Sequence, residues 1–275
     1  MPKDVIIACD FSSKAATMEF LNHFEDGRKP FVKIGMELFY AEGPDIVRVI
    51  KARGHRIFLD LKLHDIPNTV RKAMSVLSNL DVDMCNVHAA GTIDMMHAAV
   101  EGLTRPDGTR PLLLAVTQLT STSQERMQNE LLINDTIANT ICHYAANARE
   151  AGLDGVVCSP LEAAMVKERC GSEFLTVTPG IRFADAAADD QVRITTPAKA
   201  RAIGSDYIVV GRPITAAPNP VEAYNRCLRN SSARINDSGF KHNAPAFQIP
   251  FRQSNVPPNS QPSTNNIRHH AKSHC

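Results

Sequence analysis

Eight short apolar runs recur along the chain, and each is followed by a polar turn and then by a stretch with helical periodicity. Most are four to six residues long, and several are rich in β-branched residues, as buried parallel strands are. Strands that alternate with helices predict right-handed βαβ units and a parallel sheet. Eight units, with no GxGxxG after the first run, favour an α/β fold closed into a (β/α)8 TIM barrel over an open doubly wound sheet. The runs are Val5–Cys9, Phe31–Met36, Ile57–Leu61, Met84–His88, Leu112–Thr117, Gly155–Cys158, Phe174–Val177 and Tyr207–Val210.

Length and a change in composition predict one domain followed by a tail. A chain of 275 residues with 43% hydrophobic content is enough for a single barrel core, which we place at residues 1–230. Residues 231–275 contain five Pro, six Asn and seven Ser without a periodic apolar pattern, so we expect a disordered tail. Three histidines beside the final cysteine offer a weak alternative, a metal-binding tail.

The overall charge and the cysteines exclude several classes of protein. A net charge of +1, from 30 basic and 29 acidic residues, gives no general field that attracts nucleic acid or an anionic membrane. The seven cysteines are odd in number and lack CxxC spacing, which favours reduced thiols in a cytoplasmic protein over a disulfide framework. We find no signal-peptide pattern and no apolar stretch of the ~20 residues that a membrane span needs.

Charged residues gather where the third run ends. In a strand, residues two apart point to the same side, so Asp60 and Lys62 should face together. Lys33 lies in the neighbouring run and Asp65 follows shortly after. Such charges are costly inside an apolar barrel unless they are paired. A structural salt-bridge network, with Asp65 capping a helix that begins at Pro67, is one interpretation. We favour catalysis, because barrel active sites lie at the carboxyl ends of the strands.

A second group of residues follows the seventh and eighth runs, where barrels often bind phosphate. Gly180 and Gly211 would let backbone N–H groups approach an anion. Arg182 and Arg212 can each donate two hydrogen bonds to phosphate oxygens, and Gln191 lies in the long loop after the seventh run. Ordinary glycine turns with surface arginines are the alternative interpretation.

Other polar residues give weaker signals. His88 ends the fourth run and is as well suited to a structural hydrogen bond as to a role as a base. Apart from His270 and His274 in the expected tail, we find no HxxxH or carboxylate–histidine spacing that indicates a metal site, so we predict no metal site.

Several motifs together resemble the orotidine 5′-phosphate decarboxylase family in its bacterial form. The resemblance covers about residues 3–228, in the expected order, and does not include the tail. The stretch from Phe58 to Thr69 resembles the family's DxKxxDI signature. The other matching segments are Ala8–Asp10, Val32–Gly35, Val116–Ser121, Thr178–Arg182, Asp190–Gln191 and Val210–Ile214.

The resemblance implies an activity and a set of residues. The activity is decarboxylation of orotidine 5′-phosphate to uridine 5′-phosphate (UMP) and CO2, the last step of de novo UMP biosynthesis, without a cofactor. Lys62 would protonate C6 of the pyrimidine, and Asp60 would lie beside the scissile carboxylate. Lys33 and Asp65 would complete the catalytic array. The residues expected to bind substrate are Asp10, Lys33, Asp60, Lys62, Asp65, Ile66, Thr69, Thr120, Arg182, Gln191, Gly211 and Arg212.

The same resemblance implies a homodimer. Asp65, Ile66 and Thr69 would reach into the active site of the partner subunit, so that both sites are shared across the interface.

Three alternatives remain open at this stage. A related group, the 3-keto-gulonate 6-phosphate decarboxylases and hexulose-phosphate synthases, uses Mg2+, with a carboxylate ligand on the second strand. Here that position holds Lys33, whose charge would repel Mg2+. A non-catalytic barrel that binds a phosphorylated ligand would need the phosphate loops but not Lys62. An imine at Lys62 is a third possibility, and the neighbouring anions oppose it because they favour the ammonium form.

Overall fold

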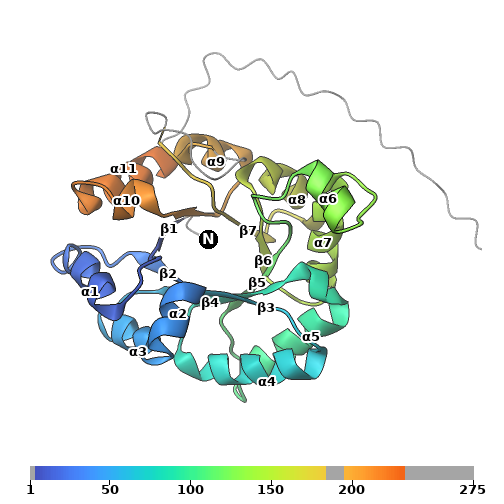
Figure 1. Ribbon diagram of the computed structural model, residues 1–275, viewed down its shortest axis with the longest axis horizontal. Coiled ribbons are helices and arrows are strands. Elements are labelled where there is room, and N and C mark those ends of the chain that lie inside the picture. Colours follow the sequence, from blue (N-terminus) through green and yellow to red (C-terminus); the bar gives the residue numbers. More distant parts are fainter. Residues whose placement is uncertain (1–3, 184–194, 233–275) are drawn as a thin grey trace, which may run out of the picture. The chain divides into compact units, whose positions relative to one another are not determined.

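The computed structural model describes residues 4–183 and 195–232. Its eight parallel strands close into one barrel in sequence order, β1 pairing with β8, which confirms the predicted fold class (Figure 1). The strands are β1 Asp4–Ala8, β2 Phe31–Gly35, β3 Ile57–Leu63, β4 Met84–His88, β5 Leu112–Val116, β6 Gly155–Val157, β7 Leu175–Thr178 and β8 Tyr207–Val210.

Helices surround the strands as an outer ring (Figure 1). Local sequence sets several of their starts: Ser13, Ser123 and Thr136 each accept a backbone N–H as N-cap, and Pro67 occupies the first turn of α4. The α-helices are α1 Lys14–Asn22, α2 Met36–Glu42, α3 Asp45–Ala52, α4 Pro67–Leu77, α5 Thr92–Leu103, α6 Gln124–Glu130, α7 Ile137–Glu150, α8 Ala163–Cys170, α9 Pro197–Ile203, α10 Arg212–Thr215 and α11 Pro220–Ser232. The short 3-10 helices are η1 Ser78–Leu80, η2 Ala89–Gly91 and η3 Pro160–Glu162.

Side chains alternate between two apolar cores. One side of each strand packs against the helices, and the other fills the inside of the barrel. Phe31 and Phe58 point into the barrel. Because side chains alternate along a strand, the next inward-facing residues are Lys33 in β2 and Asp60 in β3. The inward-facing positions are therefore apolar lower in the barrel and charged near the carboxyl ends, where a site can form.

The predicted runs match the strands closely, with one informative difference. The third apolar run ends at Leu61 and we expected Asp60 and Lys62 to end the strand, whereas β3 continues to Leu63 and contains both residues. The expected tail, residues 231–275, falls outside the described residues from 233 onward. The six cysteines within the described ranges are all free thiols. Among the described residues, no helix is long and apolar enough to cross a bilayer.

Candidate functional site

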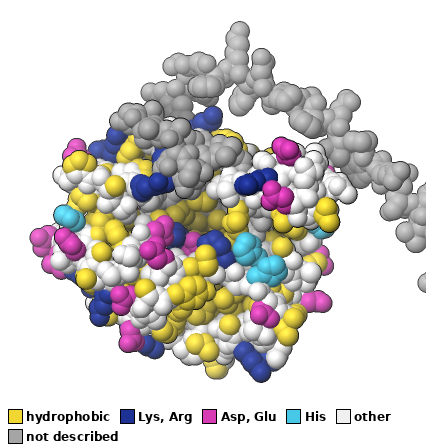
Figure 2. All heavy atoms as spheres, viewed as in Figure 1, with side chains coloured by type: hydrophobic (Ala, Val, Ile, Leu, Met, Phe, Trp, Pro, Cys, Tyr) yellow, Lys and Arg dark blue, Asp and Glu magenta, His cyan; other side chains and the backbone are white. Residues whose placement is uncertain are grey.

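A cavity of about 640 Å³ opens at the carboxyl end of the barrel. Figure 2 shows this face hollowed near its centre, with acidic and basic side chains gathered beside the hollow. The lining comes from seven of the eight strands or the loops that follow them, all except β4. Its residues are Ala8, Asp10, Lys33, Phe58, Asp60, Lys62, Val116, Gln118, Leu119, Thr120, Ser121, Val157, Cys158, Pro179, Gly180, Arg182, Val209, Gly211, Arg212 and Thr215.

Four charges form an alternating row across β1, β2 and β3. Lys33 Nζ lies 2.8 Å from Asp10 Oδ1 and 3.3 Å from Asp60 Oδ2. Lys62 Nζ lies 2.7 Å from Asp60 Oδ1. The side chains of Lys33 and Asp60 are each 11% exposed, so their charges are screened little by water. Each of these two groups has two partners of opposite charge, as charges buried at this depth require.

The pairing keeps the two central groups of this row ionised. Burial alone would raise the pKa of Asp60, but the ammonium groups of Lys33 and Lys62, with hydrogen bonds from Lys62 and Asn86, outweigh it and lower the pKa below its usual value. Burial would likewise lower the pKa of Lys33, but Asp60 and Asp10 raise it above its usual value. Both groups therefore carry charge throughout the neutral range.

A bulge in β3 contains two members of this row, Asp60 and Lys62. The β3–β4 ladder pairs Leu59 with Cys85 and then Leu63 with Val87, so residues 60–62 lie opposite Asn86 alone. Lys62 has a φ of 54°, in the left-handed region that non-glycine residues seldom adopt, at a cost on the order of 1–2 kcal/mol. Strain of this kind concentrates at functional sites.

The loops after β7 and β8 contribute the basic residues on another side of the cavity. Gly180, Arg182, Gly211 and Arg212 all line it. Gly180 has a φ of 83°, which glycine adopts without strain. The structure therefore brings both glycine–arginine pairs into the cavity that holds Lys62. Gln191 lies outside the described residues.

Of the remaining expected site residues, Thr120 lines the cavity, whereas Asp65, Ile66 and Thr69 do not. These three are exposed at the start of α4. The interpretation of Asp65 as a helix cap is wrong: the N-cap of α4 is Ile66, and Asp65 Oδ1 accepts instead from the N–H of Ile66.

A model of the orotidine 5′-phosphate decarboxylase / HUMPS family matches residues 3–227. The chain is a member of this family. Among its relatives, the orotidine 5′-phosphate decarboxylase of Bacillus cereus (strain AH820) is 58% identical over 227 residues, which cover 82% of this chain and 95% of the relative.

Solved structures agree with this membership. The crystal structure of orotidine 5′-phosphate decarboxylase from Lactobacillus acidophilus is 40% identical, with a TM-score of 0.76, covering 84% of this chain and all of the other. The crystal structure of an uncharacterized conserved protein from Geobacillus kaustophilus is 50% identical, with a TM-score of 0.75, covering 83% of this chain and all of the other.

Some residues at this family site were not among the sequence-based candidates. Ser121 and Cys158 line the cavity, and Asn86 in β4 donates a hydrogen bond to Asp60 of the charged row. A signal for Asn86 was present, because an amide two residues after Met84, in an apolar strand, must point into the barrel.

His88, the candidate base, does not line the cavity of this family member. Its ring lies 5.7 Å from that of His64, centroid to centroid. Burial lowers the pKa of His88, and the neighbouring His64 and Lys62 lower it further. The structure thus provides no contact between His88 and the space that a substrate would occupy.

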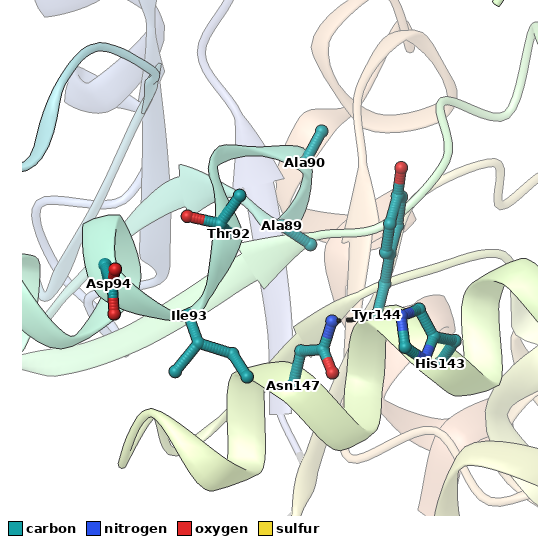
Figure 3. Close-up of a pocket in the computed structure, with 8 residues that line it drawn as sticks. All are labelled: Ala89, Ala90, Thr92, Ile93, Asp94, His143, Tyr144 and Asn147. Carbon is teal, nitrogen blue, oxygen red and sulfur yellow. Dashed lines mark hydrogen bonds between the residues drawn. The ribbon is translucent and has the colours of Figure 1, made fainter.

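A second, smaller hollow of about 370 Å³ lies outside the barrel, between the η2–α5 segment and α7 (Figure 3). It has one carboxylate and no lysine or arginine, so it lacks the fixed cations that a phosphorylated ligand needs. The lining residues are Ala89, Ala90, Thr92, Ile93, Asp94, His143, Tyr144 and Asn147.

Proposed function

We propose that this chain decarboxylates orotidine 5′-phosphate to UMP and CO2, the last step of de novo UMP biosynthesis. The observation that carries the proposal is one cavity containing both the Asp60–Lys62 pair and the two glycine–arginine loops. The first can act on a carboxylated ring, and the second can hold a phosphate. The family of the chain and the names of its relatives support the same reaction.

Lys62 acts as the acid in this proposal. As the bond from C6 to the carboxylate breaks, its electron pair stays on C6 and CO2 leaves. The ammonium of Lys62 stabilises the carbanion, transfers a proton to C6, and then regains a proton from solvent. The ion pair with Asp60, at 2.7 Å, holds the Nζ of Lys62 in place before substrate binds.

No single charge is sufficient. Lowering a barrier of this kind takes on the order of 20 kcal/mol, whereas one ion pair at ~4 Å contributes about 4 kcal/mol at an effective dielectric of ~20. Asp60 is held between the ammonium groups of Lys33 and Lys62 and repels the substrate carboxylate. This repulsion ends when CO2 departs. Binding of the phosphate by Arg182, Arg212, Gly211 and Gln191 supplies energy that holds the substrate against this repulsion.

The remaining contacts follow the sequence-based expectations. Asp10 and Lys33 bind the ribose hydroxyls, and Thr120 lies near the base. Asp65, Ile66 and Thr69 complete the site of a partner subunit, making the enzyme a homodimer. These three residues are exposed at the start of α4, and Ile66 is 66% exposed. This supports the arrangement, because burying an exposed isoleucine side chain against a partner subunit is favourable.

The Mg2+-dependent alternative is not favoured. In the part of the chain that the structure describes, no three His, Cys, Asp or Glu side chains are grouped to hold a metal ion. The ammonium of Lys33 already contacts the carboxylates of Asp10 and Asp60, which are the hard oxygen ligands that Mg2+ would need. We propose a metal-independent and cofactor-independent reaction in the cytoplasm.

The direct test is absorbance loss when orotidine 5′-phosphate is added to EDTA-treated protein, with UMP and CO2 quantified as products. Full activity after EDTA is expected, both for the whole chain and for a chain ending at Ser232. Absence of turnover would refute the proposal, and turnover restored only by Mg2+ would favour the metal-dependent alternative.

A further inference from the structure

Asn86 lies opposite the bulge of β3 that contains Asp60 and Lys62. It lies in β4, is 1% exposed, and is the only β4 residue facing the three bulged residues of β3. A bulge interrupts the ladder, so backbone groups within it need other hydrogen-bond partners.

The carboxamide of Asn86 makes two bonds, one to each member of the Asp60–Lys62 pair. Its Nδ2 donates to Asp60 Oδ1 at 2.7 Å, and its Oδ1 accepts from the backbone N–H of Lys62 at 2.8 Å. One rigid amide thus fixes both the carboxylate of Asp60 and the left-handed backbone from which the Lys62 side chain leaves.

We propose that Asn86 is a positioning residue, which sets the geometry of Asp60 and Lys62 for decarboxylation without touching substrate. This inference rests on the proposed function. Asn86 does not line the cavity, so its effect passes through its two partners.

The chemistry of an amide suits this position. Asp60 must stay fixed when a substrate carboxylate approaches, although repulsion would push it away. A third cation would hold Asp60 but would also cancel its negative charge. A neutral N–H donor holds the carboxylate without adding charge, and the amide oxygen simultaneously satisfies the Lys62 N–H.

The first test is the variant Asn86→Leu, which keeps the approximate size and removes both bonds. We expect kcat to fall roughly 100-fold, as for a small displacement of catalytic groups, with KM and the dissociation constant for UMP within about threefold of wild type. The control is Thr176→Val, which removes the hydrogen bonds of a buried hydroxyl in β7 to Gly204 and Asp206, and Thr176 does not line the cavity. It should lower thermal stability and leave kcat unchanged.

The second test is Asn86→Asp, which keeps the shape and the acceptor but replaces the donor with a carboxyl beside Asp60. Two such carboxyls share a proton when the pH falls, which restores a donor to Asp60. The kcat of this variant should therefore rise roughly tenfold from pH 8 to pH 6 relative to wild type. The other ionisable groups around the two carboxyls are Asp10, Lys33, Lys62 and His88. They are the same in both proteins, so the wild-type profile corrects for them.

The outcomes separate the two proposals. Wild-type protein without turnover refutes the proposed function. An active wild type with a folded Asn86→Leu variant of unchanged kcat refutes the role of Asn86. If Asn86→Leu does not fold, the pH profile of Asn86→Asp decides, and a profile parallel to wild type refutes the role.

Discussion

Lys33 lies between two carboxylates, and Asp60 lies between two amines. This alternation explains how several charges share the mouth of an apolar barrel, because each buried charge offsets the desolvation of the next. Removing one member deprives each neighbour of an oppositely charged partner, and breaking a fully buried pair costs about 3–5 kcal/mol. Substitutions in the row therefore affect stability as well as chemistry, and activity assays need a folding control.

The lowered pKa of Asp60 predicts a pH-dependent contribution to stability. Because its pKa in the folded chain is below the usual 3.8, folding favours the ionised form. The stabilisation that ionised Asp60 gives the folded chain is complete above the usual pKa of 3.8. It is lost as the pH falls through the lower pKa of the folded chain. The unfolding free energy of wild type, relative to Asp60→Asn, should therefore be greater at pH 7 than at pH 3. Urea unfolding at both pH values measures this difference, and an equal difference at both would contradict the pairing.

Sequence alone predicted much of this residue-scale picture. The two-residue period of a strand predicted that Asp60 and Lys62 share a side, and the structure brings them to 2.7 Å. The bonds of Asn86 were not predicted, because they depend on which residue of β4 faces the bulge. That pairing is set by the register between two strands, which no local pattern in either strand contains.

At the scale of elements, β2 and β3 supply three members of the charged row, and the loops after β7 and β8 supply the groups that we propose bind the phosphate. Each apolar run marked its strand to within two residues, since buried parallel strands are continuously apolar. The extension of β3 to Leu63 was missed because Lys62 breaks that apolar pattern. Lys62 itself adopts a left-handed backbone conformation, and β3 includes one further residue after it.

The loop after β8 predicts an effect that depends on the substrate's phosphate. Replacing Arg212 with Ala removes charge-assisted hydrogen bonds that contribute about 2 kcal/mol, so kcat/KM for orotidine 5′-phosphate should fall roughly 30-fold. Orotidine, which lacks the phosphate, is the control substrate and should react equally slowly with both proteins. Steady-state kinetics test this, and an equal loss on both substrates would show that Arg212 does not act on the phosphate.

At the scale of the whole molecule, closure of the barrel is what assembles the site. Residues from Asp10 to Arg212, far apart in sequence, line one cavity because all eight strands end at the same rim. Counting eight strand–helix units predicted this closure. The sequence also indicated Gly180, Arg182, Gly211 and Arg212 after the last two strands, and all four line the cavity. It did not single out Ser121 or Cys158, because loop conformation follows tertiary contacts rather than a repeating pattern.

The proposed homodimer with shared sites predicts complementation between two inactive variants. Lys62→Ala and Asp65→Ala damage the same site from different subunits, so a mixed dimer has one site with both changes and one with neither. Random pairing makes half of the dimers mixed, which leaves about one quarter of all sites intact. Activity should rise to about that fraction of wild type after the two variants are unfolded and refolded together. Activity no greater than the sum of the separate variants would exclude shared sites.

The most direct measurement is the turnover number of Lys62→Ala with orotidine 5′-phosphate, alongside its affinity for UMP. Loss of the acid and of the cation beside the carbanion should lower kcat by at least about 10⁴-fold, while UMP still binds. Lys199→Ala, which changes an exposed lysine on α9 outside the cavity, should retain wild-type turnover. A folded Lys62→Ala protein with kcat within tenfold of wild type would contradict the assignment of Lys62 as the proton donor.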